Sequence, residues 1–152
     1  MAPATATVHA SAVLVGARAV LIRGPSGAGK SRLALELIDA GRAGLLLFAR
    51  LIGDDRIHLE AVGGRLLVRP AQTLAGLIEV RGAGLLHLPY EPSAVVGFVV
   101  DLAAAAAERL PTPGGKRTDI AGVTLPRLAV APGAAALPAV LALITSAADA
   151  WS

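Results

Sequence analysis

The sequence predicts an α/β protein: a single P-loop-containing domain over residues 1–152, with a mixed sheet, flanking helices and a C-terminal helix. Two observations predict this class. Short apolar runs of strand length alternate with segments whose apolar residues recur at helical spacing. The first strand-to-helix transition passes through a glycine-rich loop that ends in lysine and serine. At 152 residues the chain has the length of one domain.

The first elements surround that loop. Val13–Val15 and Ala19–Ile22 are short apolar runs separated by a Gly-Ala-Arg turn, which predicts two strands. Between Leu33 and Ile38 the apolar residues fall on one helical face and the charged residues on the other, so a helix should follow the loop. Gly41 is a natural stop for this helix.

Strands and short connections alternate through the middle of the chain. The run over residues 44–52 is mostly apolar and predicts a strand that ends at Asp54 and Asp55. Two runs, 56–59 and 65–68, flank a Gly-Gly pair and predict a hairpin. The remaining predicted elements of this part are a short helical segment over 71–77, an Ile-Glu-Val-Arg-Gly-Ala-Gly segment over 78–84 and a buried strand over 95–102.

The last third should contain a helix over 103–109, a Pro- and Gly-rich loop over 110–115, a strand over 123–130 and a closing helix over 134–148. Residues 128–148 carry no charge and are long enough to cross a bilayer. Pro132, Gly133 and Pro138 interrupt this stretch. We therefore interpret it as a strand, a turn and a helix, and expect no membrane association.

Composition excludes several classes of function. The net charge is +3, but the basic residues are single and scattered, so we expect no nucleic-acid partner. The chain has no cysteine, which excludes disulfides, thiolate catalysis and Cys-based zinc sites. The N-terminal segment has no basic region typical of a signal peptide. We therefore expect a cytoplasmic protein.

Residues 24–31 form a complete G-x-x-x-x-G-K-[ST] motif. In this motif the glycines let backbone N–H groups point at phosphate oxygens, the lysine reaches the outer phosphates and the serine hydroxyl takes a Mg²⁺ position. The helix that follows adds its positive dipole end. The predicted nucleotide-binding residues are Gly24, Pro25, Ser26, Gly27, Ala28, Gly29, Lys30 and Ser31.

A phosphoryl-transfer protein also needs an acidic group at the end of another strand, to hold Mg²⁺ or to accept a proton. Asp54 and Asp55 suit this need, because alternation along a strand lets one carboxylate face the metal while the other faces the substrate. The alternative is a solvated strand end, where aspartate is common. Glu79 beside Arg81 is compatible with an ordinary surface ion pair.

The three histidines, His9, His58 and His87, show no metal-ligand spacing with one another. Each is compatible with a surface or packed histidine as well as with catalysis. Arg109 precedes the Pro- and Gly-rich loop, where it either caps a helix or stabilises transition-state charge.

Several of these features together resemble the catalytic domain of bacterial HPr kinase/phosphorylase, over nearly the whole chain. They are His9, the two first strands, the loop 24–31, Gly-Asp-Asp-Arg at 53–56 and, most specifically, Glu-Val-Arg-Gly-x-Gly at 79–84. Full-length members carry an N-terminal regulatory domain, whereas this chain begins just before His9, so the resemblance implies a short form that is the catalytic module alone.

The resemblance implies an enzyme that uses ATP and Mg²⁺ to phosphorylate a serine of HPr or an HPr-like phosphocarrier, and that reverses this with inorganic phosphate. By the same resemblance Lys30 and Ser31 bind nucleotide phosphates and Mg²⁺. Asp54 supports the metal, and Asp55 accepts the serine proton and returns it in the reverse reaction.

The other implied site residues are Glu79 as a second Mg²⁺ contact, His9 as a catalytic histidine and Arg109 as the arginine of the family's Asp-Arg-Leu-Gly motif. A homo-oligomer, a hexamer, is also implied, because family members assemble through this domain.

The sequence departs from the family pattern at three places. Residues 46–50 have no obvious counterpart and should lengthen a strand or loop, and Arg32 replaces the usual acid after the loop serine. The late loop that reads roughly Arg-Pro-Gly-Arg-Asn in the family is Ala-Pro-Gly-Ala-Ala at 131–135. That loop is associated with dephosphorylation, so we predict that kinase activity exceeds phosphorolysis.

Two other functions stay open on the sequence. One is a P-loop kinase for a small metabolite, for which no sugar or nucleoside pocket is identified. The other is a nucleotide-sensing regulatory module with little catalysis, which the altered loops would favour.

Overall fold

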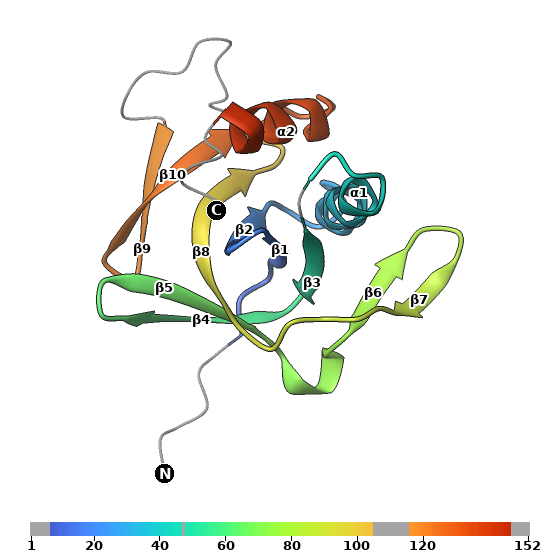
Figure 1. The fold of residues 1–152 in the computed structure, drawn as a ribbon, viewed down its shortest axis with the longest axis horizontal. Helices are drawn as coiled ribbons and strands as arrows, with labels where there is room; N and C mark the ends of the chain where they lie inside the picture. Colours follow the sequence, from blue (N-terminus) through green and yellow to red (C-terminus); the bar gives the residue numbers. More distant parts are fainter. Residues whose placement is uncertain (1–6, 47, 105–115, 147–152) are drawn as a thin grey trace.

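A computed structural model describes residues 7–46, 48–104 and 116–146. It contains one mixed sheet of eight strands, a separate two-stranded sheet and two α-helices (Figure 1). The strands are β1 Ser11–Val15, β2 Arg18–Arg23, β3 Ala49–Gly53, β4 Ile57–Val62, β5 Arg65–Pro70, β6 Leu77–Val80, β7 Gly84–His87, β8 Ala94–Asp101, β9 Arg117–Ile120 and β10 Val123–Ala129. The predicted α/β class with a mixed sheet is confirmed.

The main sheet runs in the order β3-β1-β2-β8-β10-β9, and the hairpin of β4 and β5 joins it where β5 pairs with β8. Strands β2, β8 and β10 are parallel neighbours, whereas β1 is antiparallel to both β2 and β3. It follows that β2, β3, β8 and β10 all point the same way, so that their carboxyl ends lie at one edge of the sheet.

Alternation along the central strands produces two apolar cores, one on each face of the sheet. One core joins Val20 and Ile22 of β2 to apolar residues of both helices, and the other joins Ala19 and Leu21 to the β4–β5 hairpin. With so few aromatic side chains, aliphatic residues fill both cores.

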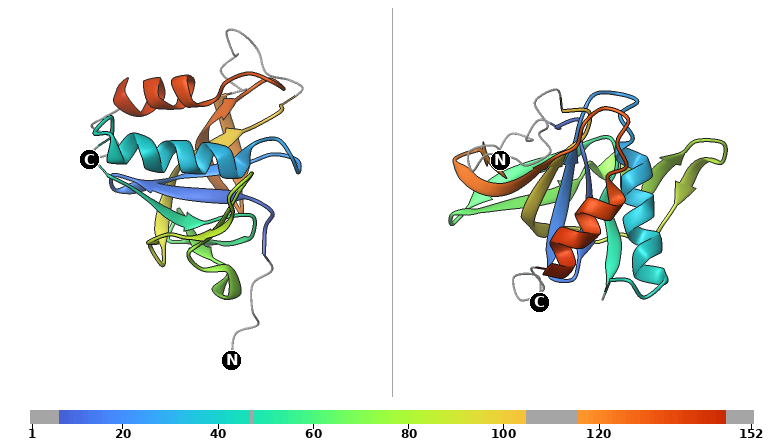
Figure 2. Two further views of the ribbon diagram at one scale, coloured as in Figure 1. Left: turned by 90° about the vertical axis from the view of Figure 1, so that its right-hand side faces the viewer. Right: turned by 90° about the horizontal axis from the view of Figure 1, so that it is seen from above.

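Helix α1 spans Lys30–Arg42 and helix α2 spans Leu137–Ser146, and both pack on the same face of the sheet (Figure 2). The buried side of α1 is formed by the predicted residues between Leu33 and Ile38, with Ala40. The prediction of a closing helix is confirmed for the described residues, with a start at Leu137 rather than at 134.

Several predicted boundaries were wrong. Gly41 lies inside α1, which ends one residue later, because Ala43 completes the C-cap with N–H bonds to Asp39 and Gly41 carbonyls. The run over 44–52 forms a strand only from Ala49, since a turn first reverses the chain after α1. The segment over 71–77 is helical only at Gln72–Leu74, as a 3-10 turn. The predicted helix over 103–109 lies mostly outside the described residues.

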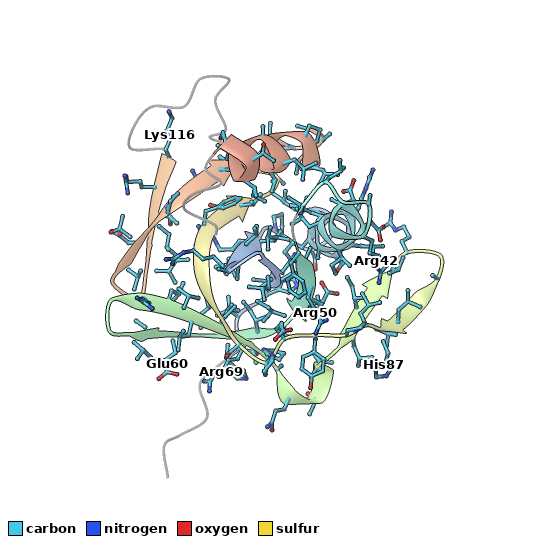
Figure 3. The ribbon with its side chains drawn as sticks, in the orientation of Figure 1. Arg42, Arg50, Glu60, Arg69, His87 and Lys116 are labelled. Carbon is cyan, nitrogen blue, oxygen red and sulfur yellow. The ribbon has the colours of Figure 1, made fainter. Side chains whose placement is uncertain are left out.

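The β6–β7 hairpin forms its own two-stranded sheet beside the main one, with His87 at its end (Figure 3). All four residues of β7 are exposed, whereas Ile78 of β6 is fully buried in the helix-side core. Strand β6 therefore anchors this hairpin to the body of the protein. Among the described residues, neither helix is long and apolar enough to cross a membrane.

Candidate active site at the glycine loop

The glycine loop leaves the carboxyl end of β2 and enters α1 at Lys30, as the sequence predicts. The structure explains why two positions of this loop are glycine. A Cβ at Gly24 would lie 3.1 Å from both the Cβ and the carbonyl oxygen of Leu102, so glycine lets the loop pass close to the residue that follows β8. Gly29 is the N-cap of α1 and has φ of 99°, a left-handed conformation that side chains disfavour.

Lys30 is 6% exposed, and its ammonium group lies inside the loop. Its Nζ donates to the carbonyl oxygens of Gly24 and Pro25 at 2.8 and 3.1 Å. The loop itself therefore holds the charged end of Lys30 beside the N-terminus of α1. A helix N-terminus with an adjacent lysine is a strong site for an anion.

Asp54 lies against Ser31, the last residue of the glycine motif. The Ser31 hydroxyl donates to Asp54 Oδ1 at 2.7 Å and to Oδ2 at 2.8 Å, across 23 residues of sequence. Asp54 is 4% exposed, and it also accepts from the Ser11 hydroxyl and the Glu79 backbone N–H. These contacts bring two of the predicted metal residues together.

Asp55 faces a different partner from Asp54. Its Oδ1 lies 2.7 Å from Nε2 of His9, and both side chains are partly open to solvent. Strand alternation does not separate the two carboxylates as predicted, because β3 ends at Gly53 and both residues follow it. The divergence instead coincides with a left-handed backbone at Asp55, φ 68°, which aspartate tolerates better than most residues.

The chain around His9 is fixed to the chain after Asp55. Val8 and Ile57 form an antiparallel bridge with both backbone bonds, and the Ala10 N–H donates to the Asp55 carbonyl. These bonds hold His9 opposite Asp55, so their side-chain contact rests on a defined backbone. The pairing of a histidine with a carboxylate is a common arrangement for proton transfer.

The backbone N–H of Glu79 donates to Asp54 Oδ2 at 3.3 Å, and Glu79 is exposed. Among the described residues, no group of three or more His, Asp and Glu side chains could hold a metal ion alone. The oxygens of Ser31 and Asp54 fit Mg²⁺ as it usually binds in nucleotide sites, where one or two protein oxygens are supplemented by phosphates and water.

Beside the loop, sequence reasoning missed an ionic cluster at the ends of three parallel strands. Arg23, the residue before Gly24, donates to Asp101 at 2.7 Å and 2.8 Å, and Arg127 donates to the same carboxylate. Burial raises the pKa of Asp101, but the hydrogen bonds and positive charges of Arg23 and Arg127 outweigh burial and hold this pKa below its ordinary value of 3.8. No local sequence pattern links residues 78 positions apart.

Two further sequence predictions concern Arg109 and the segment at 131–135. Arg109 lies outside the described residues. The Ala-Pro-Gly-Ala-Ala segment at 131–135 forms an exposed turn between β10 and α2. Of the described residues between 46 and 50, Ala49 begins β3, and the guanidinium carbon of Arg50 lies 5.2 Å from the centre of the Phe48 ring.

Comparison with known proteins identifies a family for this chain. The family described as HPr Serine kinase C-terminal domain matches residues 1–131. The chain belongs to this family. The HPr kinase C-terminal domain family contains the enzymes named HPr kinase/phosphorylase, and the resemblance inferred from the glycine loop and the Glu-Val-Arg-Gly-x-Gly segment is thereby confirmed.

HPr kinase/phosphorylase of Clostridium tetani is 37% identical over 89 residues, which are 59% of this chain and 27% of that protein. The enzyme of the same name from Streptococcus thermophilus is 40% identical over 83 residues, 54% of this chain and 25% of that protein. The chain thus spans about a quarter of the length of the curated relatives it matches.

The HPr kinase C-terminal domain fold is also shared with a solved structure, the Hpr(Ser) kinase/phosphatase of Coxiella burnetii. The TM-score is 0.72 at 24% identity, and the alignment covers 92% of this chain and 94% of that one. The overall fold of this chain is therefore one already seen in a solved structure.

Proposed function

We propose that this chain is an ATP- and Mg²⁺-dependent serine kinase that phosphorylates a small phosphocarrier protein, HPr or an HPr-like protein. The observation that carries the proposal is the contact of Asp55 with His9 beside a glycine loop that holds Lys30 and Ser31. A proton acceptor and a phosphate site thus lie at one edge of the sheet. The names of the relatives support the choice of substrate.

In this proposal the glycine loop and Lys30 bind the nucleotide phosphates, and Ser31 with Asp54 holds Mg²⁺, with Glu79 as a second contact. The bound ion neutralises charge on the phosphates. Asp55 accepts the proton of the substrate serine as the serine oxygen bonds to the γ-phosphorus. The bond from this phosphorus to the ADP oxygen breaks, and ADP leaves with the electron pair. His9 hydrogen-bonds the Asp55 carboxylate, and Arg109 stabilises developing charge.

The reverse reaction would transfer the phosphoryl group from phosphoserine to inorganic phosphate, with Asp55 returning its proton to the serine oxygen. The turn at 131–135 offers no arginine or asparagine side chain to a phosphate. Kinase activity is therefore expected to exceed phosphorolysis. Efficient phosphate-dependent dephosphorylation in a purified system would contradict this expectation.

A nucleotide-sensing module with weak catalysis is the second candidate function. It is favoured by the same altered turn, because binding residues are intact while one loop associated with chemistry is changed. Tight Mg²⁺-dependent ATP binding without transfer to any phosphocarrier would support it over the kinase.

The decisive experiment is transfer of radiolabel from ATP to purified HPr and to its nitrogen-system paralogue. Lys30→Ala and Asp55→Ala should each abolish transfer, because one removes the phosphate-binding ammonium and the other the proton acceptor. Asp39→Ala is the matched control, since this exposed carboxylate on α1 pairs only with Arg42 among the interactions described. Transfer that survives in both active-site variants rejects the assignment.

Assembly as a homo-oligomer and a cytoplasmic location belong to the same proposal. The family resemblance supports a hexamer, and the exposed Leu85 of β7, 68% accessible, is one apolar side chain open to a neighbouring subunit. Mass measurement in solution tests the assembly. A monomer at micromolar concentration would remove this part of the proposal without affecting the chemistry.

A further inference from the structure

Ser11 is a buried serine outside the predicted motifs, and it contacts the chain segment that carries Asp54 and Asp55. Within the described ranges, the polar or charged residues that are buried are Ser11, Lys30 and Asp54. The latter two belong to the candidate site already described. Ser11 is completely inaccessible and lies at the start of β1, at the edge of the sheet where β2 and β3 end.

The Ser11 hydroxyl forms two hydrogen bonds to residues more than 40 positions away. Its Oγ donates to Asp54 Oδ1 at 2.7 Å and accepts from the Asp55 backbone N–H at 3.3 Å. The single hydroxyl proton is therefore directed at Asp54, and a lone pair is directed at the left-handed turn of Asp55. One side chain thus contacts both the candidate metal residue and the backbone of the candidate base.

The bond from Ser11 to Asp54 matters most when Asp54 and Ser31 hold Mg²⁺. In the structure Ser31 donates to both oxygens of Asp54. A Ser31 oxygen that takes a Mg²⁺ position binds the ion through a lone pair and keeps its proton, but this single proton is shared between the two Asp54 oxygens. The other described protein donors that orient Asp54 are the Ser11 hydroxyl and the Glu79 N–H. Small errors in such orientation are costly, because Mg²⁺ demands near-ideal octahedral geometry.

We propose that Ser11 is a positioning residue, which orients the Asp54 carboxylate for Mg²⁺ and supports the turn that presents Asp55. The inference rests on the proposed nucleotide and metal roles of Asp54 and Ser31. Ser11 itself touches neither nucleotide nor substrate in this assignment. Its effect should therefore appear in Mg²⁺ dependence and turnover, and only weakly in the affinity for metal-free nucleotide.

The experiment compares Ser11→Ala with Ser11→Thr, which restores a hydroxyl. Titration calorimetry measures ATP affinity with and without Mg²⁺, and phosphoryl transfer measures kcat and the Mg²⁺ concentration at half activation. For Ser11→Ala we expect about a 10- to 100-fold loss in Mg²⁺-dependent affinity or in kcat, the range found for residues that orient metal ligands. ATP affinity without Mg²⁺ should stay within about threefold, and threonine should recover part of the loss.

Val13→Ala is the matched control for a purely structural effect. Val13 is two residues along the same strand, fully buried in the helix-side core, and contacts no site residue through a side-chain hydrogen bond described here. It should lower the melting temperature without moving the Mg²⁺ midpoint. If it moves the midpoint as much as Ser11→Ala, or if Ser11→Ala behaves as wild type, the positioning role is rejected.

The binding measurement also separates this inference from the kinase proposal. If wild-type protein transfers no phosphate to either phosphocarrier, the kinase proposal fails. The role of Ser11 is then still decided by whether Ser11→Ala reduces the increase in ATP affinity that Mg²⁺ causes. If wild-type protein shows no such increment, Ser11 has no metal ligand to orient and the inference is overturned.

Discussion

Replacing Asp101 with asparagine should destabilise the protein strongly, because this carboxylate lies between two arginines. The side chain of Asp101 is 15% exposed, and Arg23 and Arg127 are 31% and 21% exposed. Oδ1 accepts one bond from Arg23, and Oδ2 accepts one bond from each arginine. An asparagine keeps one accepting oxygen and turns an NH₂ group toward a guanidinium.

The magnitude follows from these bonds. A hydrogen bond to a charged group contributes about 1.5–3 kcal/mol, and Asp101→Asn loses at least one of three while removing the negative charge that the two guanidinium groups share. Relief of the cost of burying the carboxylate offsets part of the loss. We expect a net loss of about 2–4 kcal/mol, or about 4–16 °C in melting temperature for a domain of this length.

Thermal unfolding followed by circular dichroism at neutral pH measures this loss. The control is Asp39→Asn, the same chemical change in an ion pair whose two side chains are 59% exposed. Exposed pairs contribute about 0–1 kcal/mol, so the control should lose no more than about 4 °C. A melting temperature for Asp101→Asn equal to that of the control would refute the reasoning.

The dependence on pH provides a second test of the same cluster. The pKa of Asp101 is lower in the folded protein than its ordinary value of 3.8. Its contribution to stability is therefore complete above that ordinary value and is lost as the pH falls through the lower folded value. The difference in unfolding free energy between wild type and Asp101→Asn should shrink in acid below about pH 3.8. A difference that grows in acid would contradict the assignment.

Two other predictions concern the candidate active site. Asp55→Asn should lower kcat about 100-fold or more and leave the KM for ATP within about threefold. In a double-mutant cycle its effect should be non-additive with that of His9→Ala, because the two side chains act as a pair. Additive losses in steady-state kinetics would count against the pair. Gly24→Ala should weaken ATP binding about tenfold in titration calorimetry, because the new Cβ meets Leu102 at 3.1 Å and shifts the loop. Unchanged affinity would show that the loop tolerates a side chain there.

Local sequence patterns were enough for the glycine loop and its neighbours. The spacing of Gly24, Gly29, Lys30 and Ser31 defines the loop because the whole motif lies within eight consecutive residues. The buried face of α1 follows from the 3.6-residue period of its apolar residues alone. Boundaries were less predictable, as at Gly41, since the exact end of a helix depends on cap bonds that propensity does not reveal.

Residues of the site that are distant in sequence could be named only through motifs and family resemblance. His9 and Asp55 are each unremarkable alone, and their 2.7 Å contact depends on backbone pairing of Val8 with Ile57. Ser11 gives no signal beyond being a lone hydroxyl in an apolar strand. Its role is visible only because its hydroxyl is buried against Asp54.

The sequence by itself therefore determined the glycine loop, the alternation of strands and helices and the family, because each is written in short-range spacing or in a specific motif. The tertiary structure alone decided which side chains meet at the end of the sheet. Strands β2, β3, β8 and β10 point the same way, so their ends converge at one edge. The left-handed turn at Asp55 then separates two adjacent carboxylates into different environments, which strand alternation does not explain.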